Sequence, residues 1–190
     1  MRIVGGRLRG RAIVGPESGD IRPTSDRLRE AIFNILAHGY DDLVNGARVM
    51  DLFAGTGAMG LEALSRGALF ALFVDDGAQA RGLIRENIEA LGLGGVSRIF
   101  RRDATNLGKA DRFEPADIVF CDPPYGKDLA PRALASCAAG GWLREGALVI
   151  VEEKLDSPVT LPEGFSQIEQ REYGKTRFIF ARWGSIAESS

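Results

Sequence analysis

Short apolar runs alternate with amphipathic segments between residues 47 and 152. The apolar runs predict buried strands near residues 47–53, 69–75, 97–102, 116–121 and 147–152. The segments between them have helical spacing and predict helices near residues 58–66, 77–91, 104–110 and 128–139. Apolar strands that alternate with helices indicate a mostly parallel sheet that is covered by helices on both faces.

The first 45 residues carry a different pattern. Residues 3–14 alternate loosely and are rich in glycine, which suggests a short hairpin. A helix is expected to follow, capped by Thr24 or Ser25 and ending at Gly39. The apolar face expected for this helix consists of Leu28, Ile32, Ile35 and Leu36.

Two further strands are expected near the C-terminus, at residues 165–173 and 177–183. They flank the short segment Gly174-Lys175-Thr176, so a hairpin should add an antiparallel edge to the sheet. The complete pattern predicts a Rossmann-like α/β fold. It would contain one mostly parallel seven-stranded sheet, helices on both faces and a small basic N-terminal extension.

Composition agrees with a single folded domain. The 190 residues are 45% hydrophobic and 26% charged, so the chain can bury a full core. Cys121, Cys137 and the single histidine, His38, are too few and too dispersed for a metal site or a disulfide framework. No charged and apolar leader begins the sequence and no apolar run reaches membrane length. A cytoplasmic protein without a membrane partner is therefore expected.

A glycine-rich turn follows the first strand of the predicted sheet. Gly55, Gly57 and Gly60 satisfy the spacing G-x-G-x-x-G, which permits a tight turn and the close approach of a ligand. About twenty residues later, the second apolar strand ends in Asp75 and Asp76, where a carboxylate can accept hydrogen bonds from ribose hydroxyls. An adenosine-containing ligand is therefore expected at this end of the sheet.

Asp51 distinguishes between the possible adenosine ligands. A nicotinamide cofactor would place a pyrophosphate at this helix N-terminus. A carboxylate just before the glycines repels phosphate and attracts an ammonium or sulfonium group. S-adenosyl-L-methionine carries both cations and an adenosine, so it accounts for Asp51, the glycines and Asp75 together, whereas a strand-end cap without a ligand is the alternative for Asp51. Phe53 and Thr56 belong to the same turn and are further candidates for cofactor contact.

The sequence Asp122-Pro123-Pro124-Tyr125 directly follows the apolar run 118–121. Prolines fix φ and lack N–H donors, while their carbonyl oxygens can accept hydrogen bonds. The tyrosine offers a ring on which a nucleobase can stack. A carboxylate beside such a surface suits a flat base with an exocyclic amino group, although an ordinary turn would also explain the two prolines.

Four carboxylates lie at or just past the ends of predicted strands: Asp51, Asp75, Asp103 and Asp122. Ligands of an open parallel sheet bind beyond these ends, so the four carboxylates are expected to converge. Asp103, with Ala104 beside it, is a candidate to accept the adenine amino group. A helix N-cap is the alternative role for Asp103.

Positive charge is concentrated near the N-terminus, although the formal net charge is only −2. The first eleven residues contain four arginines and no acid. The planar guanidinium suits phosphate oxygens and stacks on bases, whereas scattered arginines on a solvated surface are the alternative. On the expected helix, Arg27 and Arg29 should face away from the apolar stripe. The candidates for RNA contact are Arg7, Arg9, Arg11, Arg22, Arg27 and Arg29.

These motifs together resemble a known family. The glycine turn 51–57 with the clamp 122–125 looks like the class I S-adenosylmethionine-dependent amino-methyltransferases. The segment 22–36 is similar to the signature of the RsmD family, bacterial 16S rRNA guanine-N2 methyltransferases. The resemblance covers nearly the whole chain, from residues 5–10 to residues 177–180.

The resemblance implies methyl transfer from S-adenosylmethionine to the exocyclic N2 of a guanine, with S-adenosyl-L-homocysteine as product and no metal. It also implies 16S rRNA as partner, within an assembled or assembling small ribosomal subunit, and supports the adenine contact of Asp103. One methyltransferase domain is expected over residues 1–190. Residues 1–45 would face RNA and residues 46–185 would form the catalytic core, in a protein that is a monomer by default.

Two other functions remain as alternatives. A DNA adenine-N6 methyltransferase shares the clamp, but this chain leaves little room for a separate base-reading domain. A non-catalytic RNA-binding module could retain a cofactor pocket, but the intact Asp51, Gly55, Gly57 and Asp122 argue against such a loss of activity.

Overall fold

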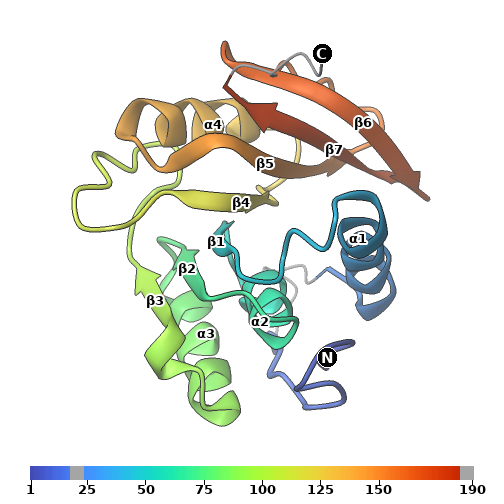
Figure 1. Ribbon diagram of the computed structural model, residues 1–190, viewed down its shortest axis with the longest axis vertical. Coiled ribbons are helices and arrows are strands. Elements are labelled where there is room, and N and C mark those ends of the chain that lie inside the picture. The colour runs from blue at the N-terminus through green and yellow to red at the C-terminus, as the bar shows by residue number, and fades with distance from the viewer. Residues whose placement is uncertain (18–23, 185–190) are drawn as a thin grey trace.

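The computed structural model describes residues 1–17 and 24–184, and its centre is a seven-stranded sheet (Figure 1). The strand order is β3-β2-β1-β4-β5-β7-β6. Five strands are parallel: β1 Arg48–Leu52, β2 Phe70–Val74, β3 Ser97–Phe100, β4 Ala116–Cys121 and β5 Leu143–Lys154. The hairpin of β6 Phe165–Tyr173 and β7 Thr176–Trp183 pairs antiparallel with β5 through β7. The predicted sheet and its antiparallel edge are confirmed.

Helices cover both faces of the sheet. Side chains of α1 Asp26–Gly39, α2 Ala58–Ser65 and α3 Ala78–Leu91 join one hydrophobic core, and those of α4 Leu129–Gly140 join the other. A short 3-10 helix, Gly94–Val96, leads into β3. Within the described part of the chain, no helix combines the length and apolar character that crossing a bilayer requires.

Side chains along each central strand alternate between the two cores. In β4, Ile118 and Phe120 enter the core under α1 to α3, while Val119 and Cys121 enter the core under α4. This alternation follows from the two-residue period of a strand. Because both faces are buried, the central strands appear in the sequence as continuous apolar runs.

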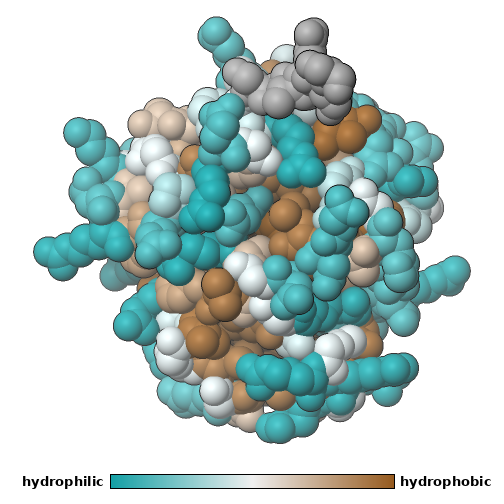
Figure 2. Space-filling view, in the orientation of Figure 1, coloured by the Kyte–Doolittle hydropathy of each residue, from teal (hydrophilic) through white to brown (hydrophobic). Residues whose placement is uncertain are grey.

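The two edges of the sheet differ from its centre. β3 has only four residues. β6 exposes most of its side chains, and its pairing with β7 shifts in register between Gln167 and Glu169. Figure 2 shows hydrophilic residues over much of one face of the molecule, with smaller apolar areas between them.

The helix predicted at residues 104–110 is wrong. This segment is irregular, although Ala104, Leu107 and Ala110 are buried in the core under α4. Their three-residue spacing resembles that of the apolar face of a helix, which explains the wrong prediction. The backbone bonds instead to neighbouring elements, since Leu107 N–H donates to Ser136 Oγ at 2.8 Å and Ala110 N–H donates to the Gly140 carbonyl at 2.9 Å.

The N-terminal segment forms the expected hairpin. Arg2 and Ala12 make an antiparallel bridge, and Ile3 N–H donates to the Arg11 carbonyl at 2.9 Å. Of the two cap candidates, Ser25 caps α1, because its hydroxyl accepts a hydrogen bond from Leu28 N–H at 3.2 Å.

The buried face of α1 differs from the predicted one. Ile32 and Leu36 are buried as expected, and Phe33 joins them, while Leu28 and Ile35 are only partly buried.

Arg29 is also buried, with 0% of its surface exposed, so its predicted outward orientation and RNA contact are wrong. Its guanidinium pairs with Glu62 at 3.3 Å and Asp26 at 2.8 Å. A buried charge persists when it is paired and hydrogen-bonded. A stripe of apolar residues alone could not reveal such a partner.

Candidate active site

A cavity of about 670 Å³ opens where β1, β2, β4 and β5 end. Its wall is formed by the start of α1, the glycine turn, the loop after β2, the Asp-Pro-Pro-Tyr clamp and one residue of β5. The volume lies in the range of about 300–1,000 Å³ that is typical of small-molecule sites. The cavity therefore has the size of a cofactor pocket and the position expected for an open α/β sheet.

The glycine turn shapes one wall of this cavity. Phe53, Gly55 and Thr56 line it, whereas Gly57 lies behind it as the N-cap of α2 with φ of +79°. Gly60 has a packing role, since a Cβ at this position would lie 2.4 Å from the Phe73 ring. The first two glycines thus allow the turn, and the third allows α2 to pack closely on β2.

Asp51 is buried at the base of the cavity. Its Oδ2 accepts a hydrogen bond from Gly60 N–H at 2.9 Å. The pKa of Asp51 is raised to about 7, mainly because the carboxyl group is buried; the Gly60 hydrogen bond opposes this shift and the charge of Asp75 adds to it. A cationic group in the cavity would stabilise the ionised form. The predicted preference for an ammonium or sulfonium ligand fits this environment.

Asp75 connects the glycine turn to the loop after β2. Its Oδ2 accepts a hydrogen bond from Gly55 N–H at 3.0 Å, and its Oδ1 accepts one from Gly77 N–H at 2.8 Å. Asp75 and the exposed Asp76 both line the cavity. Either carboxylate is therefore positioned to meet a ligand that enters it.

Asp103 and Ala104 do not line the cavity. Asp103 is exposed, and its Oδ1 accepts hydrogen bonds from the Thr105 hydroxyl at 2.7 Å and the Thr105 N–H at 2.8 Å. These bonds lower the pKa of Asp103. Ala104 is buried in the core under α4. The structure brings the other three strand-end carboxylates together, and the adenine contact of Asp103 stays a prediction.

The clamp residues Asp122, Pro123, Pro124 and Tyr125 all line the cavity. The Tyr125 hydroxyl donates a hydrogen bond to Glu152 Oε1 at 2.9 Å. Burial and the neighbouring Glu152 carboxylate raise the pKa of Tyr125, so the phenol stays protonated. The clamp and the glycine turn therefore face the same cavity.

Sequence reasoning missed Glu152 as a residue of the site and gave Thr24 only a capping role. Glu152 is 6% exposed and lines the cavity from β5. The Thr24 hydroxyl lies 3.3 Å from Glu152 Oε2 and 3.5 Å from Asp122 Oδ2. One signal was available, because Glu152 ends the apolar run of β5 just as Asp51 interrupts that of β1.

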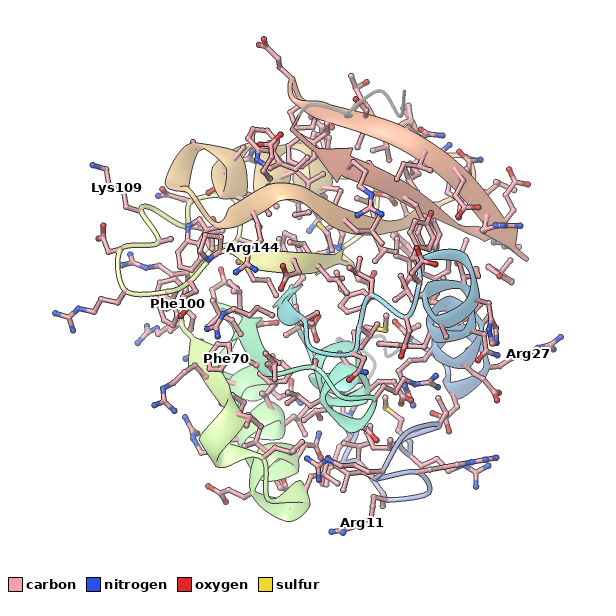
Figure 3. All side chains as sticks on the ribbon, in the orientation of Figure 1. Arg11, Arg27, Phe70, Phe100, Lys109 and Arg144 are labelled. Atoms are coloured by element: carbon pink, nitrogen blue, oxygen red, sulfur yellow. The ribbon has the colours of Figure 1, made fainter. Side chains whose placement is uncertain are left out.

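Of the remaining arginine candidates, the four that the structure describes do not line the cavity. Arg7, Arg9, Arg11 and Arg27 are exposed on the N-terminal hairpin and α1. Arg11 and Arg27 extend outward from the molecule in Figure 3. Arg22 lies outside the described residues. The four described arginines are therefore accessible to a large partner at the surface.

Comparisons with known proteins agree with the site described above. The model of the family described as Conserved hypothetical protein 95 matches residues 1–182. Ribosomal RNA small subunit methyltransferase D of Escherichia coli strain K12 is 36% identical over 180 residues, or 94% of this chain and 87% of that protein. The protein of the same name from Haemophilus influenzae is 30% identical over 176 residues, or 92% of this chain and 89% of that protein.

The chain belongs to the RsmD family. Solved structures extend this likeness: that of yhhF, a provisionally named methyltransferase from Escherichia coli, has a TM-score of 0.82 and 31% identity. The alignment covers 97% of this chain and 98% of that one. Membership in the RsmD family confirms the resemblance carried by the glycine turn, the clamp and segment 22–36, and it makes the protein a methyltransferase.

Proposed function

We propose that this protein transfers the methyl group of S-adenosylmethionine to the exocyclic N2 of a guanine in 16S rRNA. The observation that carries the proposal is the single cavity that joins the buried Asp51 to the Asp122 clamp. Asp51 makes this cavity favourable for a cation, and the clamp offers a carboxylate and an aromatic ring to a base. The names of its relatives, which act on small-subunit rRNA, support the choice of substrate.

The cavity residues fit the cofactor by chemistry. S-adenosylmethionine supplies an electrophilic methyl group on a positively charged sulfur when it is bound, and S-adenosylhomocysteine is the product. In this proposal Asp51 interacts with the positive charge, while Asp75 or Asp76 accepts hydrogen bonds from the ribose hydroxyls. Phe53, Gly55 and Thr56 shape the wall, with Gly57 behind it, and Asp103 with Ala104 would meet the adenine.

The clamp supplies the chemistry at the base. The N2 lone pair of guanine is delocalised into the ring, so the amine is a weak nucleophile that must be held in line with the methyl group. Asp122 and the Pro123 carbonyl accept the two N2 hydrogens, while Tyr125 stacks on the base with Pro124 beside it. Such positioning can contribute about 7–11 kcal/mol in favourable systems.

The proposed transfer is a single displacement at the methyl carbon. The carbon–sulfur bond breaks as the carbon–nitrogen bond forms, and the sulfonium becomes a neutral thioether. Positive charge develops on N2, where the Asp122 carboxylate stabilises it and then takes or relays the released proton. These steps require no metal ion.

The exposed arginines would hold the RNA. The hairpin and α1, within residues 1–45, would face the phosphate backbone, and residues 46–185 would form the catalytic core. The target guanine must be unpaired or flipped, which a loop nucleotide permits at low cost. A small subunit, assembled or assembling, is the proposed substrate, and a monomer working in the cytoplasm is the form proposed to act on it.

Transfer of tritiated methyl groups tests the proposal. The protein is incubated with unmethylated small subunits, free rRNA, duplex DNA and a protein mixture, and the labelled products are digested to nucleosides. N2-methylguanosine from rRNA is the expected product, and primer extension then maps the guanine. Labelled N6-methyladenosine from DNA would favour the DNA alternative, and absence of any product would favour the non-catalytic one.

A further inference from the structure

We propose that Glu152 accepts the N1–H of the target guanine and thereby makes the cavity select guanine over adenine. The inference rests on the proposed function and adds a residue that determines base specificity. Asp122 by itself can hold an amino group on either purine, so another contact must distinguish the two bases.

The sheet places the two carboxylates next to each other. β4 and β5 are parallel neighbours, and Cys121 pairs with Val151. Asp122 and Glu152 are the next residues on these strands, and both line the cavity. The Thr24 hydroxyl lies within 3.5 Å of an oxygen of each, so both carboxylates lie within reach of one small group.

The orientation of Glu152 is held from two sides. Tyr125 donates from its hydroxyl to Oε1 at 2.9 Å, and Thr24 donates to Oε2 at 3.3 Å. Both neighbours supply hydrogens, so Glu152 serves them as an acceptor. A carboxylate oxygen can accept more than one hydrogen bond, so a donor on a bound base can join these contacts.

Guanine matches two adjacent acceptors. On its Watson–Crick edge the N1–H and the N2 amino group are neighbouring donors, which Glu152 and Asp122 would accept. Adenine presents an unprotonated N1 beside its amino group. With the adenine amino group at Asp122, this lone pair would face the Glu152 carboxylate without a hydrogen between them, which costs affinity.

Glu153, the residue after Glu152, offers a matched control. It is also buried, at 4% exposure, but it does not line the cavity. Its Oε1 accepts a hydrogen bond from Lys154 N–H at 2.9 Å. Glu152→Gln and Glu153→Gln therefore make the same chemical change in neighbouring buried positions, only one of which faces the base.

The test uses 2-aminopurine, which keeps the amino group at C2 but has no N1–H. Small subunits are reconstituted with rRNA that carries either guanine or 2-aminopurine at the mapped position, and kcat/KM is measured for each. The wild type should prefer guanine by at least about 100-fold, because a site built to accept a hydrogen bond rejects an analogue without the donor. The side-chain amide of Glu152→Gln can donate to N1, so this variant should reduce the preference to about tenfold or less. Glu153→Gln should keep the wild-type preference.

A purely structural role of Glu152 would lower both rates together and leave their ratio unchanged, and that result overturns the inference. Equal wild-type rates on the two substrates also overturn it, and this measurement needs no folded variant. Failure of the wild type to methylate the guanine substrate would instead remove the proposed function itself. Melting temperatures and S-adenosylmethionine affinities of both variants show whether each protein is folded and binds its cofactor.

Discussion

At the scale of single residues, Asp122 occupies the position where charge is proposed to develop. Replacing it with alanine removes both the acceptor for the amine and the group that takes the proton. We expect kcat for methyl transfer to fall by about 10³-fold, because positioned acid–base groups commonly contribute about 10²–10⁴-fold. S-adenosylmethionine affinity, measured by calorimetry, should change only a few fold. An equal loss of both quantities would show that Asp122 supports the pocket rather than the reaction.

Asp51 should make cofactor binding depend on pH. Burial raises its pKa to about 7, so at neutral pH about half of the molecules carry a protonated Asp51. A positively charged ligand favours the ionised form, so binding at pH 7 should release about half a proton from this group. Calorimetry in buffers of different ionisation enthalpy measures the release, and Asp51→Asn should lose that share of it.

The raised pKa of Asp51 also makes the stability of the folded protein depend on pH, and stability falls as pH rises. The folded-state pKa lies above the unfolded value, so the contribution of Asp51 to the free energy of unfolding is complete below about pH 4 and is lost as pH rises through about 7. The cofactor-free protein should therefore gain stability from Asp51→Asn most clearly at pH 8.

Proton release on cofactor binding tests both predictions. If it is unchanged in Asp51→Asn, another group must be the one that titrates.

At the scale of elements, the N-terminal hairpin, α1 and α2 are joined by one buried carboxylate. Glu62 accepts hydrogen bonds from Val4 N–H and Gly5 N–H, and it forms ion pairs with Arg29 and Arg66. The hairpin therefore attaches to the helix that follows the glycine turn, and its basic side chains are held at a fixed position relative to the cavity.

Breaking this buried pair should destabilise the fold. Arg29→Met leaves Glu62 without its fully buried cation, and removal of one partner of such a pair costs about 3–5 kcal/mol. Urea unfolding measures the loss. Arg27→Ala, on the exposed side of the same helix, should change the free energy of unfolding by no more than about 0.5 kcal/mol. Equal effects of the two substitutions would contradict the buried position of Arg29.

The contact of α2 with β2 gives a second test at this scale. Gly60→Ala places a methyl group 2.4 Å from the Phe73 ring, and overpacking of this kind costs about 1–3 kcal/mol. Gly82→Ala in α3 meets no atom within 4 Å and should stabilise its helix by about 0.5–1 kcal/mol. Thermal unfolding should therefore shift in opposite directions for the two substitutions, and a stabilised Gly60→Ala would refute the close approach.

At the scale of the whole molecule, the exposed arginines of the N-terminal hairpin lie outside the lining of the catalytic cavity. Replacing Arg7, Arg9 and Arg11 with alanine should weaken RNA binding and flatten its salt dependence, by roughly 0.7–0.9 in the logarithmic slope per lost phosphate contact. The matched control replaces Arg98, Lys109 and Arg112, three exposed cations of β3 and the segment before β4. Filter binding from low to high salt measures both slopes, and equal slopes for the two variants would remove the hairpin from the RNA interface.

Most of this architecture could be predicted from the sequence, because burial on both faces leaves continuous apolar strands and the glycine turn and clamp are local motifs. The predictions that the structure corrected or missed share one cause. Residues 104–110 form hydrogen bonds with α4 instead of among themselves, Arg29 is buried because a distant Glu62 compensates its charge, and Glu152 reaches the site through the pairing of β5 with β4. Each depends on a partner far away in the chain, which local spacing cannot supply.

The edges of the sheet have a consequence for how copies of the protein meet. An open edge strand can recruit a strand from a second molecule and begin aggregation. β3 offers only four residues for such pairing, while β6 carries the exposed charged side chains Arg171 and Glu172 and an irregular register near Glu169. Both edges therefore discourage strand exchange between copies, and concentrated solutions of the protein should resist aggregation through the sheet.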